Sequence, residues 1–142
     1  MTQRFTGKRV LVTSSDRNMG PPIAAAIKAE GAEGIESTDK RQTQEAVDAL
    51  TDQLGNIDIL VANFAEPPRA GQLGKIEDED WFQLFDSLTH PLMRICRALV
   101  PKMKAQGHGK VVAVTSASSL RGIPGFSGYC AARGAHSVKN AT

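Results

Sequence analysis

Three short runs of almost unbroken apolar residues constrain the fold of this chain most strongly. They read KRVLVT from Lys8 to Thr13, IDILVAN from Ile57 to Asn63, and KVVAVT from Lys110 to Thr115. Runs of this kind are typical of strands that are buried on both faces of a parallel sheet. The sequence therefore predicts a parallel sheet whose two faces are covered by helices.

Segments with helical spacing or helix-boundary residues separate these runs. We expect a weaker second strand over Glu33 to Ser37, and helices from Gly20 to Gly31, Gln42 to Leu54, about Trp81 to Met103, and after Gly125 to Gly128. Pro91 should kink the long helix. Strands that alternate with helices in this way form right-handed βαβ units. We predict one doubly wound, Rossmann-like α/β domain over residues 1–142. We expect it to be the N-terminal part of a larger domain, so that apolar strand faces stay partly uncovered.

Composition excludes several classes of function. The 17 basic and 15 acidic side chains give a net charge of +2 without a basic run, so we expect no nucleic-acid partner. No apolar stretch reaches the roughly 18 residues of a membrane span, which predicts a cytoplasmic protein with no membrane partner. Cys96 and Cys130 are expected to be reduced thiols. His90, His108 and His136 lack ligand spacing, so no metal is predicted.

A tyrosine and an arginine four residues apart give the clearest functional signal. Tyr129 and Arg133 belong to one predicted helix, where positions i and i+4 share a face, and Ser116 lies thirteen residues before Tyr129 at the end of a predicted strand. Taken alone, the pair would more often be an ordinary surface contact. The strand context and the spacing to Ser116 favour a catalytic set of Ser116, Tyr129 and Arg133.

The turn after the first predicted strand is poor in glycine. It reads Thr13-Ser14-Ser15-Asp16-Arg17-Asn18-Met19-Gly20. Glycines in such a turn allow a tight bend and a close approach of the backbone to a pyrophosphate. Side chains at Ser14 and Asn18 should obstruct that approach, and Asp16 should repel it, although Asp16 and Asn18 also suit an ordinary turn.

Together these segments resemble the short-chain dehydrogenase/reductase superfamily along the whole chain. The family motifs are Thr-Gly-x-x-x-Gly-x-Gly, Asn-Asn-Ala-Gly, a helical asparagine, and Ser with Tyr-x-x-x-Lys. This chain has Ala62-Asn63-Phe64-Ala65 at the second motif, Leu88 at the asparagine position and Arg133 at the lysine position. Because that lysine also binds the nicotinamide ribose in the family, the changes point away from a dinucleotide cofactor.

One branch of the superfamily, the halohydrin dehalogenases, shows the same combination of Ser, Tyr and Arg. The stretches GKRVLVT, IDILVANFA and HPLMRICRALVP look like its B-type members. The resemblance implies a cofactor-independent enzyme that converts haloalcohols to epoxides and opens epoxides with halide or other small anions. It implies a halide pocket near Asn18, Asn63 and Phe64, a further halide-binding loop beyond Thr142, and a homo-oligomer, either a dimer or a tetramer.

The proposed residue types suit this chemistry. An ordinary tyrosine, with a pKa of about 10, is a weak base at neutral pH, and a nearby fixed positive charge favours the phenolate form. Arginine supplies a charge that does not dissociate. Ser116 would fix the substrate oxygen against Tyr129, while Asn63 would more readily serve as a hydrogen-bond bracket between loops than as a catalyst.

Two other interpretations remain open. The chain is alternatively a divergent NAD(P)-dependent oxidoreductase of the same superfamily, or an inactive fragment that keeps only an interaction surface. Binding of a nicotinamide cofactor would distinguish the first of these from the dehalogenase.

Overall fold

The computed structural model describes residues 3–37 and 43–137. Four strands alternate with four helices: β1 (Arg9–Thr13), α1 (Gly20–Ala29), β2 (Glu33–Ser37), α2 (Gln44–Leu54), β3 (Ile59–Ala62), α3 (Asp78–Ala105), β4 (Lys110–Ala113) and α4 (Ser127–Gly134). Two short 3-10 turns, η1 (Ala117–Ser119) and η2 (Ala135–Ser137), flank α4.

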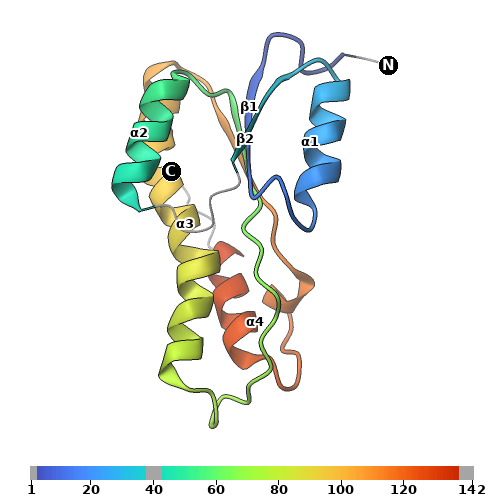
Figure 1. Ribbon diagram of the computed structural model, residues 1–142, viewed down its shortest axis with the longest axis vertical. Helices are drawn as coiled ribbons and strands as arrows, with labels where there is room; N and C mark the ends of the chain where they lie inside the picture. The colour runs from blue at the N-terminus through green and yellow to red at the C-terminus, as the bar shows by residue number, and fades with distance from the viewer. Residues whose placement is uncertain (1–2, 38–42, 138–142) are drawn as a thin grey trace.

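The four strands form one parallel sheet in the order β2-β1-β3-β4. Helix α1 covers one face of the sheet, and α2 and α3 cover the other (Figure 1). The predicted doubly wound α/β fold is therefore confirmed. Because all strands run in the same direction, the segments that follow β1, β3 and β4 meet at one edge of the sheet, where open α/β sheets hold their ligands.

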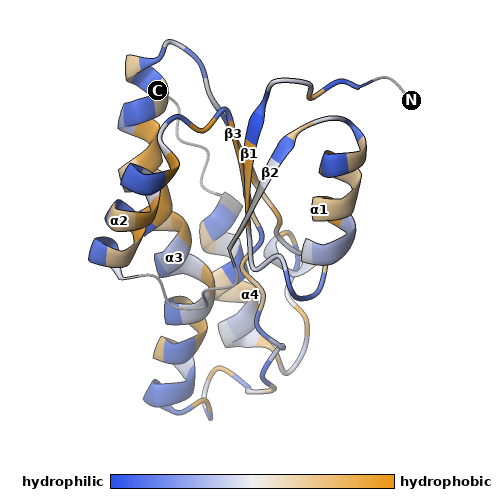
Figure 2. Ribbon diagram, turned by 45° about the horizontal axis from the view of Figure 1, so that its top comes forward, coloured by the Kyte–Doolittle hydropathy of each residue, from blue (hydrophilic) through white to orange (hydrophobic). Residues whose placement is uncertain are grey.

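The core is divided by the sheet into two layers. Leu11, Leu60 and Phe64 pack with Ile95 and Leu99 on the α2 and α3 side. On the α1 side, Val10, Val12 and Val61 pack against Ile27. Figure 2 shows orange in the middle of the sheet, and orange residues alternating with blue ones along α2 and α3. Alternate residues of the same strand serve opposite layers, which explains why the strand sequences are continuously apolar.

The helix boundaries differ from the prediction in detail. Helix α3 begins at Asp78 rather than near Trp81, because three acidic residues form its first turn and stabilise the partial positive charge there. It continues through Pro91 and ends at Ala105. Helix α2 begins after Thr43, whose hydroxyl accepts a hydrogen bond from the Ala46 N–H (3.2 Å). The predicted start of that helix, Gln42, lies outside the described residues.

Strand β4 is not buried on both faces as its apolar run predicted, and its exposure fits the expectation that apolar strand faces stay partly uncovered. Val111 is 41% exposed and Val112 is 50% exposed. The physical reason is position, since β4 lies at the edge of the described sheet and pairs there with β3 alone.

Within residues 3–37 and 43–137, no helix combines the length and apolar character that a membrane span requires.

Candidate functional site

The predicted pair of Tyr129 and Arg133 forms in the structure on helix α4. The Arg133 Nε donates a hydrogen bond to the Tyr129 hydroxyl oxygen at 3.1 Å. The guanidinium carbon also lies 5.3 Å from the centre of the tyrosine ring. A phenolic oxygen that accepts from a cation keeps its own proton free to donate to a ligand.

Two backbone carbonyls fix the other side of the Arg133 guanidinium. Nη1 donates to the Phe64 carbonyl (3.0 Å) just after β3, and to the Val114 carbonyl (3.3 Å) just after β4. Arginine presents five donors in a rigid fork, which lets one side chain reach all three acceptors at once. Arg133 therefore joins α4 to the ends of two strands, which a lysine ammonium could not reproduce.

Arg133 is also a buried charge without an acidic partner. The residue is only 6% exposed, and no described Asp or Glu forms an ion pair with it. Burial of an uncompensated charge is unfavourable, so such a site attracts an anion. Nη2 makes no hydrogen bond to the described residues, which leaves two N–H groups for a ligand.

Helix α4 depends on its neighbours for its position. Its eight residues are too few to form a stable helix alone. The Thr89 hydroxyl donates to the Ala132 carbonyl (3.0 Å), and the Thr115 hydroxyl donates to the Arg133 carbonyl (3.4 Å). A side chain at Gly128 would lie 2.7 Å from Ile76, so α4 packs closely against that segment and α3. These contacts hold Tyr129 and Arg133 in place.

Ser116 lies half-buried in the turn after β4. Its hydroxyl oxygen accepts a hydrogen bond from the Ser118 N–H at 3.3 Å. The hydroxyl proton therefore remains available to donate to a substrate oxygen. In the described part of the chain, no direct hydrogen bond joins the Ser116 and Tyr129 hydroxyls, so a substrate would have to lie between them to contact both.

The loop after β1 keeps the backbone shape that glycine normally supplies. Ser14 has a φ of 46° and Asn18 a φ of 48°, both in the left-handed region. These are the two positions at which the sequence lacks the expected glycines. The third, Gly20, is required, because a side chain there would collide with the Ser14 carbonyl oxygen. The turn of a dinucleotide site is thus present, but with side chains in it.

The first turn of α1 offers few donors to a pyrophosphate. Pro21 and Pro22 lack backbone N–H groups. The flanking N–H groups are already used, since Gly20 donates to the Arg17 carbonyl (2.8 Å) and Ile23 donates to the Met19 carbonyl (3.1 Å). Phosphate sites at helix N-termini depend on free N–H groups. The two prolines weaken this turn as an anion site.

The three residues predicted to line a halide pocket have different environments. The Asn63 side-chain amide donates to the Ser14 carbonyl (3.2 Å) and the Arg17 carbonyl (3.4 Å), so it is the structural bracket that its position suggested. The Phe64 side chain is 2% exposed and packs in the core, while its carbonyl binds Arg133. Asn18 is exposed. Of the three side chains, Asn18 is the one open to solvent.

The predicted repulsion by Asp16 is reduced in the structure. Both of its carboxylate oxygens accept from Arg17, at 3.0 Å and 2.5 Å. This contact raises the pKa of Arg17. The negative charge of the loop is therefore largely balanced beside it.

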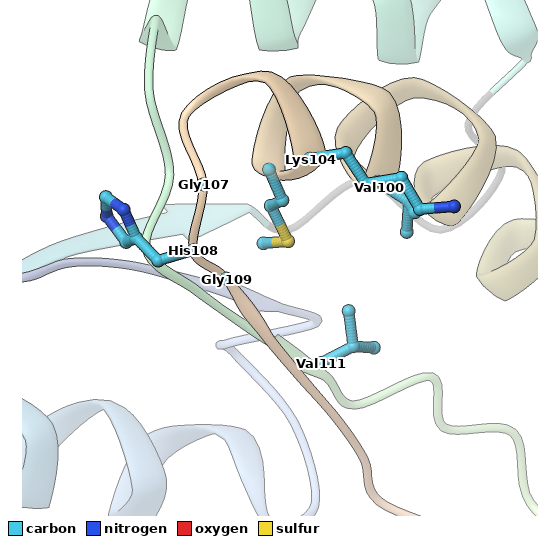
Figure 3. A pocket seen from close by; sticks show the side chains of 7 residues that line it. Val100, Lys104, Gly107, His108, Gly109 and Val111 are labelled. Carbon is cyan, nitrogen blue, oxygen red and sulfur yellow. The ribbon is translucent and has the colours of Figure 1, made fainter. Parts of the chain in front are cut away.

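Two surface hollows of the described chain lie away from Tyr129. One, of about 360 Å³, lies between the end of α3 and β4, where Val100, Met103 and Val111 line it (Figure 3). The other, of about 460 Å³, lies where the strands begin and includes Lys8, Asp58 and His108. Neither hollow is lined by Ser116, Tyr129 or Arg133, so neither is the predicted active site.

Sequence reasoning missed two residues, His136 and Thr89, that form hydrogen bonds between α3 and the segments around the site. Leu88 was predicted to occupy the place of a relay asparagine, and its side chain is fully buried. Its carbonyl, however, accepts a hydrogen bond from His136 Nε2 at 2.7 Å. Thr89 reaches α4 in the same region. No local signal marked His136, because its hydrogen-bond partner lies 48 residues away.

Comparison with known proteins places this arrangement in a family. Residues 6–138 match the model of the short chain dehydrogenase family. The chain belongs to this family. The short-chain dehydrogenase fold accounts for the parallel sheet and for the position of Ser116 and Tyr129 at its carboxyl edge.

Curated relatives of this chain include several reductases. The 3-oxoacyl-acyl-carrier-protein reductase FabG of Haemophilus influenzae is 28% identical over 89% of this chain and 62% of its own length. The human dehydrogenase/reductase SDR family member 4 is 30% identical over 91% of this chain and 57% of its own length. This chain therefore spans less than two thirds of either relative.

Solved structures show the same fold. A gluconate 5-dehydrogenase from Burkholderia cenocepacia, in complex with NADP and tartrate, has a TM-score of 0.82 and 26% identity over 95% of this chain and 64% of its own. A structure described as a dehalogenation enzyme has a TM-score of 0.79 and 23% identity, also over 95% and 64%. The second likeness, at this identity, is one of fold.

Proposed function

We propose that this short-chain dehydrogenase homologue is a cofactor-independent halohydrin dehalogenase. The observation that supports this most directly is the buried Arg133 guanidinium, which has no acidic partner among the described residues and donates to the Tyr129 hydroxyl. Such a charge stabilises an anion beside it, either the tyrosine phenolate or a bound anionic ligand. Loss of glycine at Ser14 and Asn18, and of donors at the start of α1, argues against a dinucleotide.

The reaction requires proton transfer but no transfer of electrons to a cofactor. Tyr129, as phenolate, takes the proton from the substrate hydroxyl, while Ser116 donates a hydrogen bond to that oxygen. The oxygen then attacks the neighbouring carbon, and the carbon–halogen bond breaks as the halide leaves with the bonding electrons. Arg133 orients Tyr129 and stabilises its negative charge. The products are an epoxide, a halide ion and protonated Tyr129.

Halide release from a vicinal bromoalcohol tests this proposal. The protein should release bromide without added cofactor, Tyr129→Phe should abolish the release, and Arg133→Lys should reduce it strongly. Arg121→Lys changes an exposed arginine outside the site and is the matched control. Release that survives Tyr129→Phe would exclude Tyr129 as the base and with it this mechanism.

The second candidate is an NAD(P)-dependent oxidoreductase of the same family. The curated reductase relatives favour it, and so does the left-handed backbone retained at Ser14 and Asn18. Thermal unfolding with NADH or NADPH distinguishes the two candidates. A ligand at about 100 times its Kd stabilises by roughly 2.7 kcal/mol, so millimolar cofactor would raise the melting temperature of an oxidoreductase measurably. We expect no shift; a shift without bromide release would establish the second candidate.

We also propose that the protein forms a homo-oligomer. Phe82 is 62% exposed and Met93 is 42% exposed, both on α3. Large apolar side chains on an outer helix face suit a protein interface. Sedimentation of Phe82→Lys and of the parent protein tests this, because a dimer or tetramer held by α3 should dissociate in the variant.

A further inference from the structure

Two buried polar atoms beside the candidate site have no hydrogen-bond partner within residues 3–37 and 43–137. They are His136 Nδ1 in η2 and the Ser118 hydroxyl oxygen in η1. The two 3-10 turns pack against each other beside α4. Buried polar atoms are nearly always paired, so each unpaired one requires a physical explanation.

The hydrogen bond at the opposite ring nitrogen defines the state of His136. Its Nε2 lies 2.7 Å from the Leu88 carbonyl oxygen, which can only accept. Nε2 therefore carries a proton, and in the neutral ring Nδ1 is an acceptor. Burial lowers the pKa of His136 below its ordinary value of 6.5, and the Arg133 charge lowers it further, so the neutral ring is favoured.

Ser118 supplies the complementary group. The residue is buried, and its backbone N–H donates to the Ser116 hydroxyl oxygen (3.3 Å). Its own hydroxyl is a donor whose proton has no acceptor among the described residues. An unpaired donor and an unpaired acceptor in touching segments are both satisfied by one bridging water, which commonly makes two to four such bonds.

We propose that His136 is a positioning residue of this site, and that one buried water joins its Nδ1 to the Ser118 hydroxyl. The inference rests on the proposed function only in taking Ser116, Tyr129 and Arg133 as the reacting groups. Through this link the turn that carries Ser116 is tied to the helix that carries Tyr129 and Arg133. The Nε2 bond to Leu88 ties both to α3.

The proposed link is sensitive to acid. Protonated Nδ1 is a donor and can no longer accept, and the new charge lies near the buried Arg133 guanidinium. Among the described residues, the charge that acts on His136 is Arg133 of α4, and α3 contributes the uncharged Leu88 carbonyl. Because the pKa of His136 is lowered in the folded state, its contribution to stability is complete above pH 6.5. This contribution to stability is lost as the pH falls from 6.5 to below the lowered pKa of His136.

Nuclear magnetic resonance on the labelled protein tests the link without reference to halide release. Tyr129 is the sole tyrosine and the chain has three histidines, so ring-carbon labels give one tyrosine signal and three histidine signals. We expect His136 to titrate below pH 6.5 and the Tyr129 signal to shift with the same midpoint. His136→Gln, which keeps a donor and an acceptor but does not titrate, should remove that shift. His108→Gln, at an exposed histidine outside the site, should leave it unchanged.

A double-mutant cycle tests the partner. If the water joins them, His136→Leu and Ser118→Ala each lower the melting temperature, and the double variant melts close to His136→Leu alone. Additive effects would overturn the link between Ser118 and His136. A Tyr129 signal that does not shift as His136 titrates would overturn the positioning role. Neither readout depends on which reaction the protein catalyses, so a failed dehalogenase assay would leave both tests intact.

Discussion

Replacement of Arg133 should reveal how much of the site depends on one side chain. In Arg133→Met the Phe64 and Val114 carbonyls lose the guanidinium, which donates to them at 3.0 Å and 3.3 Å. A buried acceptor left without a partner costs about 1–3 kcal/mol. Removal of a buried, unpaired charge offsets part of the loss. We expect a net loss of about 2–3 kcal/mol in the free energy of unfolding.

Thermal unfolding followed by circular dichroism measures this effect. For a chain of this size each kcal/mol corresponds to about 2–4 °C, so Arg133→Met should lower the melting temperature by roughly 4–12 °C. Arg133→Lys keeps the charge but lacks the fork of donors, and should lose about half as much. Arg121→Lys should not change the melting temperature, because Arg121 is exposed.

The coupling between Arg133 and Tyr129 is the more specific part of this prediction. With the 3.1 Å hydrogen bond present, the cycle of Arg133→Met and Tyr129→Phe should be non-additive by about 1 kcal/mol. An unchanged melting temperature in Arg133→Met would refute the three hydrogen bonds derived for this residue. Full stability in Arg133→Lys would show that a point charge suffices and that the geometry of the fork is irrelevant.

Three further predictions concern the loop, the helix and the sheet. Ser14→Gly should raise the melting temperature by a few degrees, because glycine adopts a φ of 46° without strain; Ser14→Val should lower it, and equal values would exclude strain at this position. Gly128→Ala should destabilise by about 1–3 kcal/mol in chemical denaturation, because the added carbon would lie 2.7 Å from Ile76; a neutral result would mean that α4 shifts freely. The Arg9 N–H, and then His108, lower the pKa of Asp58 below its usual 3.8, so its contribution should be lost as the pH falls below 3.8. Melting curves of Asp58→Asn and the parent should converge in acid, and a constant difference would contradict the assignment.

The fold was largely predictable because its signals are local. Continuous apolar runs marked β1, β3 and β4 to within two residues of their observed ends, and helical spacing marked α2. The apolar run by itself did not decide the exposure of β4, because the same run fits a central strand and an edge strand. Which one it is depends on the strands that pair with it, and those lie far away in the sequence.

In the candidate site, too, contacts between residues close in sequence were predictable and contacts between distant segments were not. Residues four apart on a helix meet whatever surrounds the helix, so the contact between Tyr129 and Arg133 followed from spacing alone. The environment of Phe64 did not, since a side chain after a strand can turn toward the core or toward a pocket. Its burial is decided by Ile95 and Leu99 of α3, which pack in the same cluster.

The sequence by itself determined the α/β class, the order of its elements and the pairing of Tyr129 with Arg133, because continuous apolar runs and a spacing of four residues carry that information. The tertiary structure alone decided that Arg133 is buried, with no acidic partner in the described part of the chain, and bonded to carbonyls 69 and 19 residues away. It also decided that Ser14 and Asn18 keep the glycine-like turn, and that His136 reaches Leu88. Such contacts join segments distant in the chain, and their energies depend on burial, which exists only once the sheet and helices have packed.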